Sequence, residues 1–167
     1  RKSPDIGERP NRQPKRDGVD VGVAMCAQLR EHLRHGQTEY EHRFITVGFV
    51  ELSGTDDLLA EQGPDALTRA VDEMVGVVQG AAADNGVTML SSDMTANGVK
   101  IILTSGVPVV AGDDETRVLA ALRQIVRPAQ ALRVRAGVTR GPVFAGDYGP
   151  FYRKTYSITG DVVNLAA

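Results

Sequence analysis

Along the chain, apolar side chains recur with either a helical or a strand period, and the changes of period mark the expected elements. Residues 19–35 place apolar side chains at the spacing of one helix face, which predicts a short amphipathic helix that ends at Gly36. Residues 43–52 are mostly apolar and β-forming, which predicts a buried strand. A second helical pattern covers residues 57–85, and Gly63-Pro64 predicts a break within it.

The second half of the chain alternates shorter strands with helices. Residues 87–94 and 99–105 predict two strands joined by a tight turn, because Asn97-Gly98 between β-rich runs is the strongest short signal for a hairpin. A helix capped by Gly112-Asp113-Asp114 should run to about Val126. Three more strands are expected at residues 132–139, 143–146 and 155–159, before a final helix from about Asp161. This order predicts an α+β fold, ferredoxin-like, in which helices pack against one mixed β-sheet.

The ends of the chain differ from its middle. Residues 1–18 contain three prolines among charged residues and almost nothing to bury, so we expect a disordered linker. Residues 19–40 would form the N-terminal helix and its linker, and residues 41–167 a single domain. The chain begins without Met and stops inside a helical pattern at Ala167, so we expect a C-terminally truncated fragment of a longer protein.

In composition the 167 residues resemble an ordinary globular protein, with 42% hydrophobic and 24% charged residues. The formal net charge of -2 gives no bulk attraction to nucleic acid or to an anionic membrane. No apolar run is long enough to cross a bilayer and no signal-peptide pattern opens the chain, so we expect a cytoplasmic protein without a membrane segment. One cysteine and three scattered histidines exclude an internal disulfide and a Cys/His metal cluster.

Three segments of the chain resemble the class III nucleotidyl cyclases. Residues 141–146 (G-P-V-F-A-G) resemble that family's G-P-V-x-A-G turn, and residues 160–166 resemble its G-x-x-V-N-x-A helix start. Residues 43–52 resemble the family's first strand, R-x-V-T-V-L-F-A-D-I. The resemblance implies a catalytic domain that dimerises, closes ATP or GTP at the interface, and forms cyclic AMP or cyclic GMP with release of pyrophosphate. It also implies two Mg²⁺ or Mn²⁺ ions held by two carboxylates.

The resemblance places the family's first metal-binding carboxylate on Glu51. Glutamate can bind Mg²⁺, although its extra methylene shifts the oxygens within a close octahedral site. The other interpretation of Glu51 is a strand-end charge that is solvated or paired with a base. Ser53, Gly54 and Thr55 fall on the turn whose backbone N–H groups would hold the substrate phosphates. We interpret the two aspartates that follow as caps of the next helix.

The predicted hairpin lacks the two polar groups that the family carries there. If Gly98 is the glycine of the family's K-x-x-G-D pattern, Val99 stands at the second metal aspartate and Thr95 at the purine-reading lysine. A shift of register would instead bring in Asp93 or Lys100. The simple hairpin is preferred. The resemblance therefore predicts a metal site that has lost part of its ligand set.

The C-terminal motif keeps more of the family's residues. Asn164 falls on the asparagine that orients the ribose, a catalytic position, and Ser157 on the position that selects the purine. A serine hydroxyl can donate or accept one hydrogen bond, so it discriminates adenine from guanine less firmly than aspartate does. The transition-state arginine of the family would follow just beyond Ala167. Four aromatic residues near the last hairpin are open to two interpretations, dimer contact or core packing: Tyr148, Phe151, Tyr152 and Tyr156.

These residues support one enzymatic and one non-enzymatic hypothesis. In the first, the domain forms the cyclic nucleotide, either as a homodimer through Glu51 with one metal position degraded or, impaired alone, as the metal-free half of a heterodimeric or tandem cyclase whose partner is a second cyclase domain. In the second, it is a catalytically dead cyclase-like domain that serves as a dimerisation or regulatory module in signal transduction. An unrelated ferredoxin-like domain with a coincidental G-x-x-V-N is disfavoured, because two separate motifs agree with the strand order.

Overall fold

The computed structural model describes residues 25–36, 40–96, 98–127, 131–150 and 152–167. The predicted linker at residues 1–18 lies outside these ranges, as do residues 19–24 of the first predicted helix and Asn97 of the predicted turn. In chain order the elements are α1 (Ala27–Arg34), β1 (Glu41–Ser53), α2 (Thr55–Gln62), α3 (Pro64–Asp84), β2 (Thr88–Thr95), β3 (Gly98–Ser105), α4 (Asp114–Val126), β4 (Arg133–Tyr148), β5 (Thr155–Thr159) and α5 (Asp161–Ala166).

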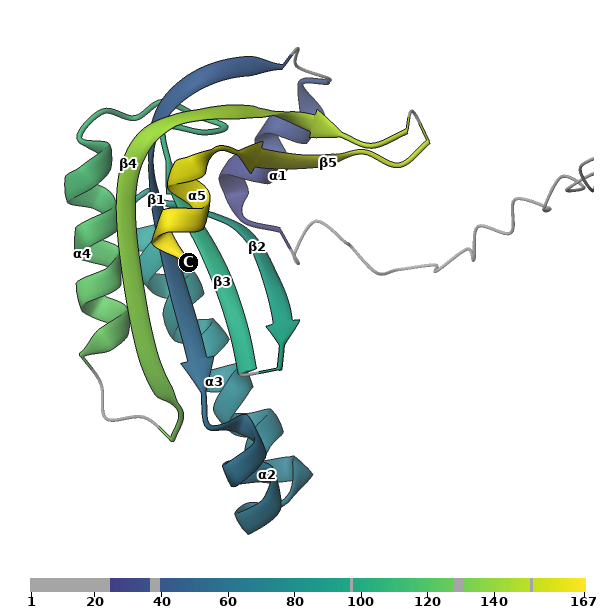
Figure 1. Ribbon diagram of the computed structural model, residues 1–167, viewed down its shortest axis with the longest axis vertical. Helices are drawn as coiled ribbons and strands as arrows, with labels where there is room; N and C mark the ends of the chain where they lie inside the picture. Colours follow the sequence, from purple (N-terminus) through teal and green to yellow (C-terminus); the bar gives the residue numbers. More distant parts are fainter. Residues whose placement is uncertain (1–24, 37–39, 97, 128–130, 151) are drawn as a thin grey trace, which may run out of the picture.

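The strands form one sheet in the order β2-β3-β1-β4-β5. Each of the four pairings between these strands is antiparallel, so the described sheet is not mixed as the sequence suggested. Helices α3 and α4 cover one face, and α5 covers part of the other, with α1 beside it (Figure 1). The predicted α+β sandwich is therefore confirmed. The lower part of the α5 face carries no helix in Figure 1.

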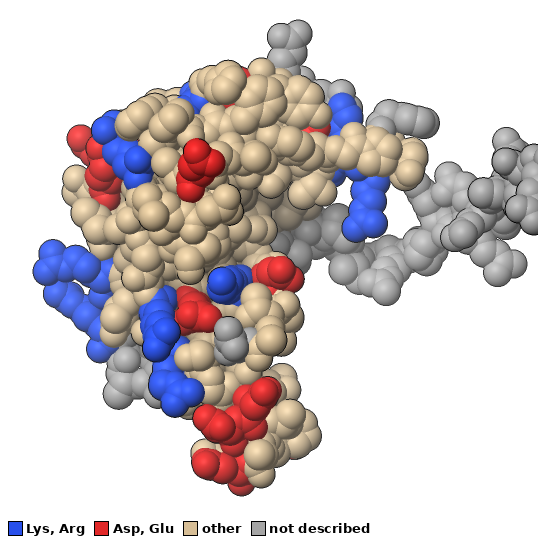
Figure 2. Space-filling view, in the orientation of Figure 1, with Lys and Arg blue, Asp and Glu red and all other residues tan. Residues whose placement is uncertain are grey.

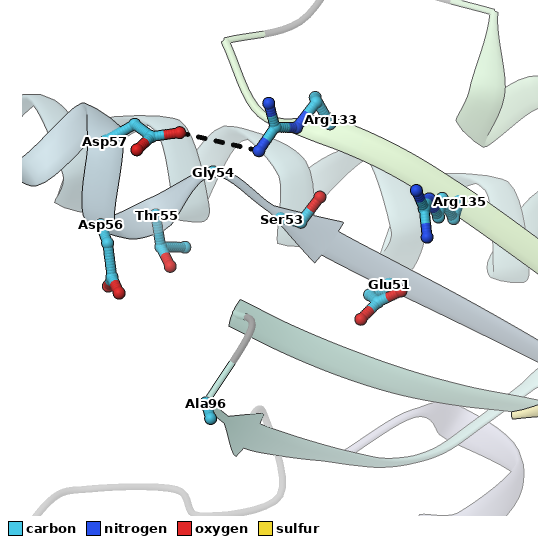
Figure 3. Close-up of a pocket in the computed structure, with 9 residues that line it drawn as sticks. All are labelled: Glu51, Ser53, Gly54, Thr55, Asp56, Asp57, Ala96, Arg133 and Arg135. Carbon is cyan, nitrogen blue, oxygen red and sulfur yellow. Dashed lines mark ion pairs between the residues drawn. The ribbon is translucent and has the colours of Figure 1, made fainter.

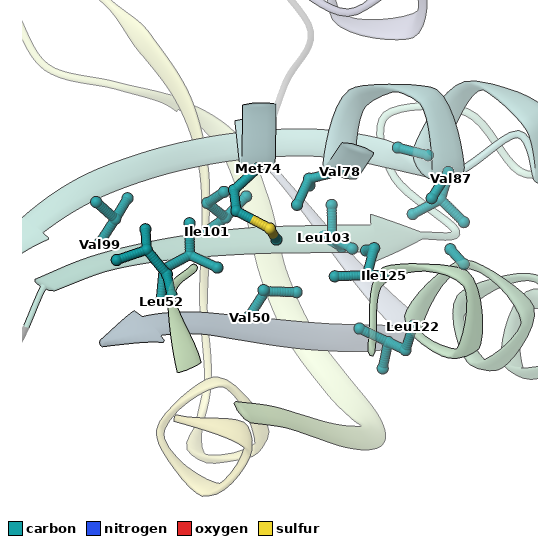
Figure 4. Close-up of a cluster of buried hydrophobic side chains, with 14 of the residues drawn as sticks. Val50, Leu52, Met74, Val78, Val87, Val99, Ile101, Leu103, Leu122 and Ile125 are labelled. Carbon is teal, nitrogen blue, oxygen red and sulfur yellow. The ribbon is translucent and has the colours of Figure 1, made fainter. Parts of the chain in front are cut away.

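The central strand β1 is buried on both sides, which explains its nearly continuous apolar sequence. Val50 and Leu52 belong to the helix-side cluster, which also contains Met74 of α3 and Leu122 of α4 (Figure 4). Ile45 belongs to the second cluster, on the α5 face. Val50, Leu52 and Ile45 are each 0% exposed. Full burial of such a side chain contributes about 1.5–3 kcal/mol, so this strand anchors both layers.

The predicted helix over residues 57–85 is confirmed as two helices with a break at Gly63. Gly63 has a φ of +81°, a left-handed conformation that favours glycine, and its N–H donates to the Leu59 carbonyl at 3.0 Å. Pro64 then opens α3, where its missing N–H costs nothing. α3 has 21 residues, and no helix in the described part of the chain is both long and apolar enough to cross a membrane.

β4 is one continuous strand, where the sequence predicted two strands separated by a glycine turn. It has 16 residues, and the 13 from Arg133, opposite Ser53, to Ala145, opposite Glu41, pair with β1 without interruption. The predicted turn at Gly141-Pro142 therefore lies inside the strand. That prediction was wrong because glycine here serves close packing and not a reversal of the chain.

Two glycines of β4 let α5 lie directly on the sheet. A Cβ atom at Gly141 would overlap the side chain of Val162, and one at Gly137 would overlap the backbone carbonyl of Ala166. The two glycines are four residues apart, so they share one face of the strand. The final helix was predicted from about Asp161 and is confirmed there. Its close packing on β4 depends on these two glycines.

We expect Gly137→Ala to destabilise the fold by about 1–3 kcal/mol, because the added methyl forces α5 away from β4. Urea unfolding of the purified chain measures the change. Gly76→Ala is the matched control, because its Cβ meets nothing within 4 Å in the middle of α3. That control should stabilise the chain by up to about 1 kcal/mol. Equal effects of the two substitutions would contradict the packing argument.

Candidate functional site

Three elements enclose a cavity of about 460 Å³ at one end of the sheet (Figure 3). β1 ends there, α2 and β4 begin there, and the β2–β3 hairpin lies on the open side. The lining residues are Glu51, Ser53, Gly54, Thr55, Asp56, Asp57, Ala96, Arg133 and Arg135. The structure thus brings together the predicted metal residue and all three residues of the predicted phosphate turn.

The turn between β1 and α2 depends on Gly54. Its φ of +91° lies in the left-handed region that favours glycine, and its carbonyl accepts the Leu58 N–H at 3.1 Å. Ser53 is the last residue of β1, and the buried Thr55 is the first of α2. The first N–H groups of a helix have no partner within it, so the turn leaves backbone donors beside the cavity.

Asp56 and Asp57 lie in the first turn of α2 and do not cap it as predicted. The N-cap residue is Gly54, and α2 has no side-chain capping hydrogen bond. Both carboxylates still favour the helix, because its N-terminus carries partial positive charge. Asp57 forms an ion pair with Arg133 at 3.6 Å, with both side chains more than 70% exposed. Such an exposed pair adds little stability.

A row of alternating charges crosses the sheet beside this cavity. Lys100 and Arg135 stand directly opposite Glu51 on its two neighbouring strands, and Asp93 stands opposite Lys100 on the far side. Directly opposite residues lie on the same face, with Cβ atoms roughly 4.5–5.5 Å apart. Figure 2 shows blue and red side chains alternating on this uncovered face. The register thus places a cation on each side of Glu51.

This arrangement does not fit a two-metal site. A divalent ion on Glu51 would lie about one side chain's length from two positive charges, and two unit charges about 5 Å apart repel by about 3 kcal/mol at an effective dielectric constant of 20. Among the described residues, no three His, Cys, Asp or Glu side chains gather so as to hold a metal ion. The row supports the alternative interpretation of Glu51, a strand-end charge beside a base.

The hairpin positions do not face the cavity as the family pattern requires. Val99, at the expected place of the second metal aspartate, is 4% exposed and packs into the helix-side core with Leu52. Glu51 is the next residue before Leu52, so it points to the opposite face. Thr95, at the expected place of the purine-reading lysine, donates its hydroxyl to the Gly98 carbonyl at 3.3 Å. The preferred simple hairpin is confirmed, because Thr95 pairs directly with Gly98; Lys100 and Asp93 lie on the same face as Glu51.

Two arginines of the cavity were missed from the sequence. Arg133 and Arg135 begin β4, and pairing with β1 sets them opposite Ser53 and Glu51. Their spacing of two residues puts both on one face of the strand. That spacing was a usable signal, but only the register with β1 shows which face it is.

The other two predicted site residues lie away from the cavity. Ser157 is in the middle of β5, half-buried and opposite Gly146, and Asn164 is exposed on α5. Neither lines the cavity. Gly146 follows Arg135 by eleven residues of the same strand, so the path along β4 is up to about 36 Å at about 3.3 Å per residue. Ser157 is therefore far along β4 from the cavity, whereas α5 ends near Glu51, because Ala166 and Ala167 line a smaller cavity with Glu51 and Arg135.

The aromatic residues of the last hairpin divide between core and surface. Tyr156 is 5% exposed and its ring meets the His32 ring of α1 edge-on, at 4.4 Å between centroids. Tyr152 is 77% exposed, and Phe151 lies outside the described residues. Tyr148 donates its hydroxyl to the Phe144 carbonyl at 3.2 Å. Core packing is thus the correct interpretation for Tyr156.

Tyr156, the residue before Ser157, has a phenol whose pKa is raised. Burial, reinforced by the Glu41 carboxylate, raises the pKa of Tyr156 to about 12; Arg43 lowers it and Asp147 raises it further. Within the described residues, the Tyr156 hydroxyl and one carboxylate oxygen of Asp147 are buried without a hydrogen-bond partner. The base of the β4–β5 hairpin therefore contains polar groups that favour the neutral phenol.

No protein-family model matches the sequence, and no curated protein matches it. Solved structures do match. The adenylyl cyclase CyaB from P. aeruginosa superposes with a TM-score of 0.65 at 22% identity, over 77% of this chain and 71% of that one. The guanylate cyclase domain of RhGC from Catenaria anguillulae, in complex with GTP, gives 0.63 at 20% identity, over 77% and 72%. A bacterial light-regulated adenylyl cyclase gives 0.69 at 13% identity, over 86% and 45%.

At these identities the likeness establishes the fold. The chain has the fold of adenylyl and guanylyl cyclase catalytic domains. The fold expected from the resemblance to class III cyclases is therefore confirmed.

We expect the stability of the chain to fall between pH 10 and pH 12 through Tyr156. Its pKa is raised from 10.0 to about 12 on folding, so the folded chain keeps the phenol proton where the unfolded chain loses it. The contribution is fully present below pH 10 and is lost as the pH rises to about 12. Between pH 9 and pH 11, Tyr156→Phe should lose about 1 kcal/mol less free energy of unfolding than the wild type.

Urea unfolding at pH 9 and pH 11 measures this difference. Tyr152→Phe is the control, because it removes an exposed phenol from the same hairpin and should follow the wild type. A parallel decline of Tyr156→Phe and wild type would show that the buried phenol does not titrate as stated.

Proposed function

We propose that this chain is one half of a composite nucleotidyl cyclase site and needs a second domain to form cyclic AMP or cyclic GMP from ATP or GTP. The supporting observation is the separation of its two groups of candidate residues. The residues at the end of β1 share one cavity, whereas Ser157 and Asn164 lie on β5 and α5 outside it. Neither Ser157 nor Asn164 lines this cavity or the smaller one that shares Glu51 and Arg135 with it. A complete site therefore combines groups from two domains.

Asn164 and Ser157 are the residues that this chain would contribute. In the reaction, the ribose 3′ oxygen bonds to the α-phosphorus, pyrophosphate leaves, and the hydroxyl proton passes to solvent. The exposed amide of Asn164 would orient the ribose before attack, which is a fixed electrostatic contribution to the transition state. Ser157 would contact the purine edge with one hydrogen bond. Mg²⁺ or Mn²⁺ held by carboxylates of the second domain would supply Lewis acid chemistry.

The partner in this proposal is a second cyclase domain that carries the metal carboxylates. In a pair of identical copies, each Glu51 would have Lys100 and Arg135 beside it, and neither copy would offer a fitting two-metal site. Pairing with a different domain avoids this conflict. Because a nucleoside triphosphate is the substrate, we propose the cytoplasm as the compartment of this activity.

The second candidate function is a catalytically dead domain used for dimerisation or regulation in signal transduction. The cations that flank Glu51 and the buried Val99 favour it equally, because both remove metal chemistry from this chain. The role of Asn164 distinguishes the two candidate functions. In a half-site its amide affects turnover, whereas in a scaffold it affects nothing beyond surface solvation.

We expect Asn164→Ala to lower cyclase turnover by a factor of about 10²–10³, as the loss of one positioned donor does elsewhere. The chain is mixed with a metal-bearing cyclase domain from the same genome whose own asparagine at this position has been replaced by alanine. Cyclic product from ATP or GTP is measured with Mn²⁺ present. The chain alone should give no product, and the mixture should give product that depends on Asn164.

Gln124→Ala controls for the loss of an exposed amide, because Gln124 is exposed on α4, the helix that covers the other face of the sheet. Analytical ultracentrifugation of each mixture checks that both variants still associate. Association without Asn164-dependent product in any pairing would exclude the half-site and leave the scaffold function.

A further inference from the structure

A groove of about 430 Å³ lies along the outer edge of β2 and shares no lining residue with the cavity at the end of β1. Strand β2 is an edge strand (Figure 1), and in the described part of the chain it pairs only with β3. Met89 packs against the helix-side cluster and Leu90 belongs to the cluster on the α5 face, yet both line the groove. Ser91 and Ser92, which follow a shift of register with β3, line it too and are exposed. The groove therefore follows the free backbone edge of the strand and not one face of the sheet.

The two walls of the groove come from α1 and α3. Residues 25–29, at the start of α1, form one wall, and the other consists of Gln79, Ala82 and Ala83. Met25, Leu29 and Met89 are only half-buried in this groove. An uncovered edge strand presents unpaired N–H and C=O groups that can pair with another strand. The groove thus offers backbone partners along its floor and apolar contacts along its sides.

The described part of the chain begins at this groove. Met25 lines it, and residues 19–24, which lie outside the described ranges, directly precede Met25. Cys26 also lines the groove and is the N-cap residue of α1. Its φ of -62° and ψ of 154° are those of extended backbone, and α1 begins only at Ala27. The residues before α1 therefore enter beside the edge of β2.

The sequence before Met25 has the pattern of a strand. Residues 19–23 read Val-Asp-Val-Gly-Val, in which valine alternates with another residue at a period of two. Valine is enriched in strands, because its branched side chain packs well on a pleated surface. Five residues of a strand span about 16 Å, which is enough to cover residues 89–92 of β2. The segment next to the groove thus has the length and the pattern to fill it.

We propose that residues 19–23 occupy this groove as a further strand of the sheet, hydrogen-bonded to the outer edge of β2. Addition of a strand to a free sheet edge is a general mode of peptide recognition, in which main-chain hydrogen bonds give affinity. The valines cover the half-buried Leu29 and Met89. The groove thus anchors the N-terminal part of the chain to the domain. Neither Asn164 nor a partner domain takes part, so this proposal is independent of the half-site.

Hydrogen exchange of the full 167-residue chain, followed residue by residue by NMR, tests this proposal. Amides of residues 19–23 that donate to β2 should exchange at least about tenfold more slowly than those of residues 1–18, because exchange requires the added strand to open. The outer amides of residues 89–92 should be slowed as well. Residues 19–23 that exchange as fast as residues 1–18 would overturn the proposal.

Two proline substitutions test the hydrogen bonds of the added strand. Successive N–H groups of a strand point in opposite directions, so either Val21 or Gly22 donates toward β2. Proline lacks the N–H group, so at least one of Val21→Pro and Gly22→Pro should speed the exchange of residues 89–92 about tenfold. Ile6→Pro is the matched control, because it removes the N–H of a β-branched residue outside the proposed strand, and it should change nothing. No effect of either test substitution would contradict the pairing.

Cys26 gives a second readout, because it is the single cysteine of the chain and lines the groove. A strand in the groove shields the thiol, so alkylation by iodoacetamide should be about tenfold slower in the wild type and in Ile6→Pro than in the releasing proline variant. Equal rates in all variants would show that the groove is open. Slow exchange of residues 89–92 that persists in both proline variants and weakens on dilution would assign the groove to a second copy of the chain, and would overturn the proposal.

Discussion

The register of β1 between β3 and β4 is the constraint on which the rest of the structure depends. Side chains alternate between the two faces of a strand, so a slip by one residue would exchange every buried position with an exposed one. In the observed register, Val50 and Leu52 enter the helix-side core with 0% exposure, and Glu51 between them faces the uncovered side. The same register sets Lys100 and Arg135 beside Glu51. One pairing thus fixes both the core and the charge row.

Most of the fold could be predicted because its signals are local. Gly63-Pro64 predicted a break in the helical pattern of residues 57–85, and α2 ends and α3 begins there. Residues 155–159 were predicted as a strand and form β5. The prediction failed at Gly141, where local chemistry suggested a turn. The true reason for that glycine lies in Val162, which packs against it from α5. A contact between separate elements cannot be seen in the sequence of either one.

The candidate site was less predictable, because its residues meet only through pairing between strands. The turn at Gly54 was found from its motif, and its cavity is present. Arg133 and Arg135 were not assigned a role, although both line that cavity. Val99 was assigned to the second metal position by counting from Gly98, but its side chain is buried in the core. Motif counting gives the position of a residue along the strand, but the face on which it lies depends on the register.

The geometry also bears on how one half of the proposed composite site could change without damage to the other. The charge row lies on the uncovered face, so a cation at position 100 disturbs no core contact of Val50 or Leu52. Charges at physiological ionic strength are screened over about 8 Å. The path along β4 from Arg135 to Gly146, the residue that pairs with Ser157, is up to about 36 Å. The charge row and Ser157 therefore lie at opposite ends of β4, whereas α5 ends beside the row, because Ala166 and Ala167 line a cavity with Glu51, Lys100 and Arg135. In the proposed composite site, a substitution in the charge row can thus leave Ser157 and the core in place, so that two domains could divide metal binding and purine contact between them and each keep its fold.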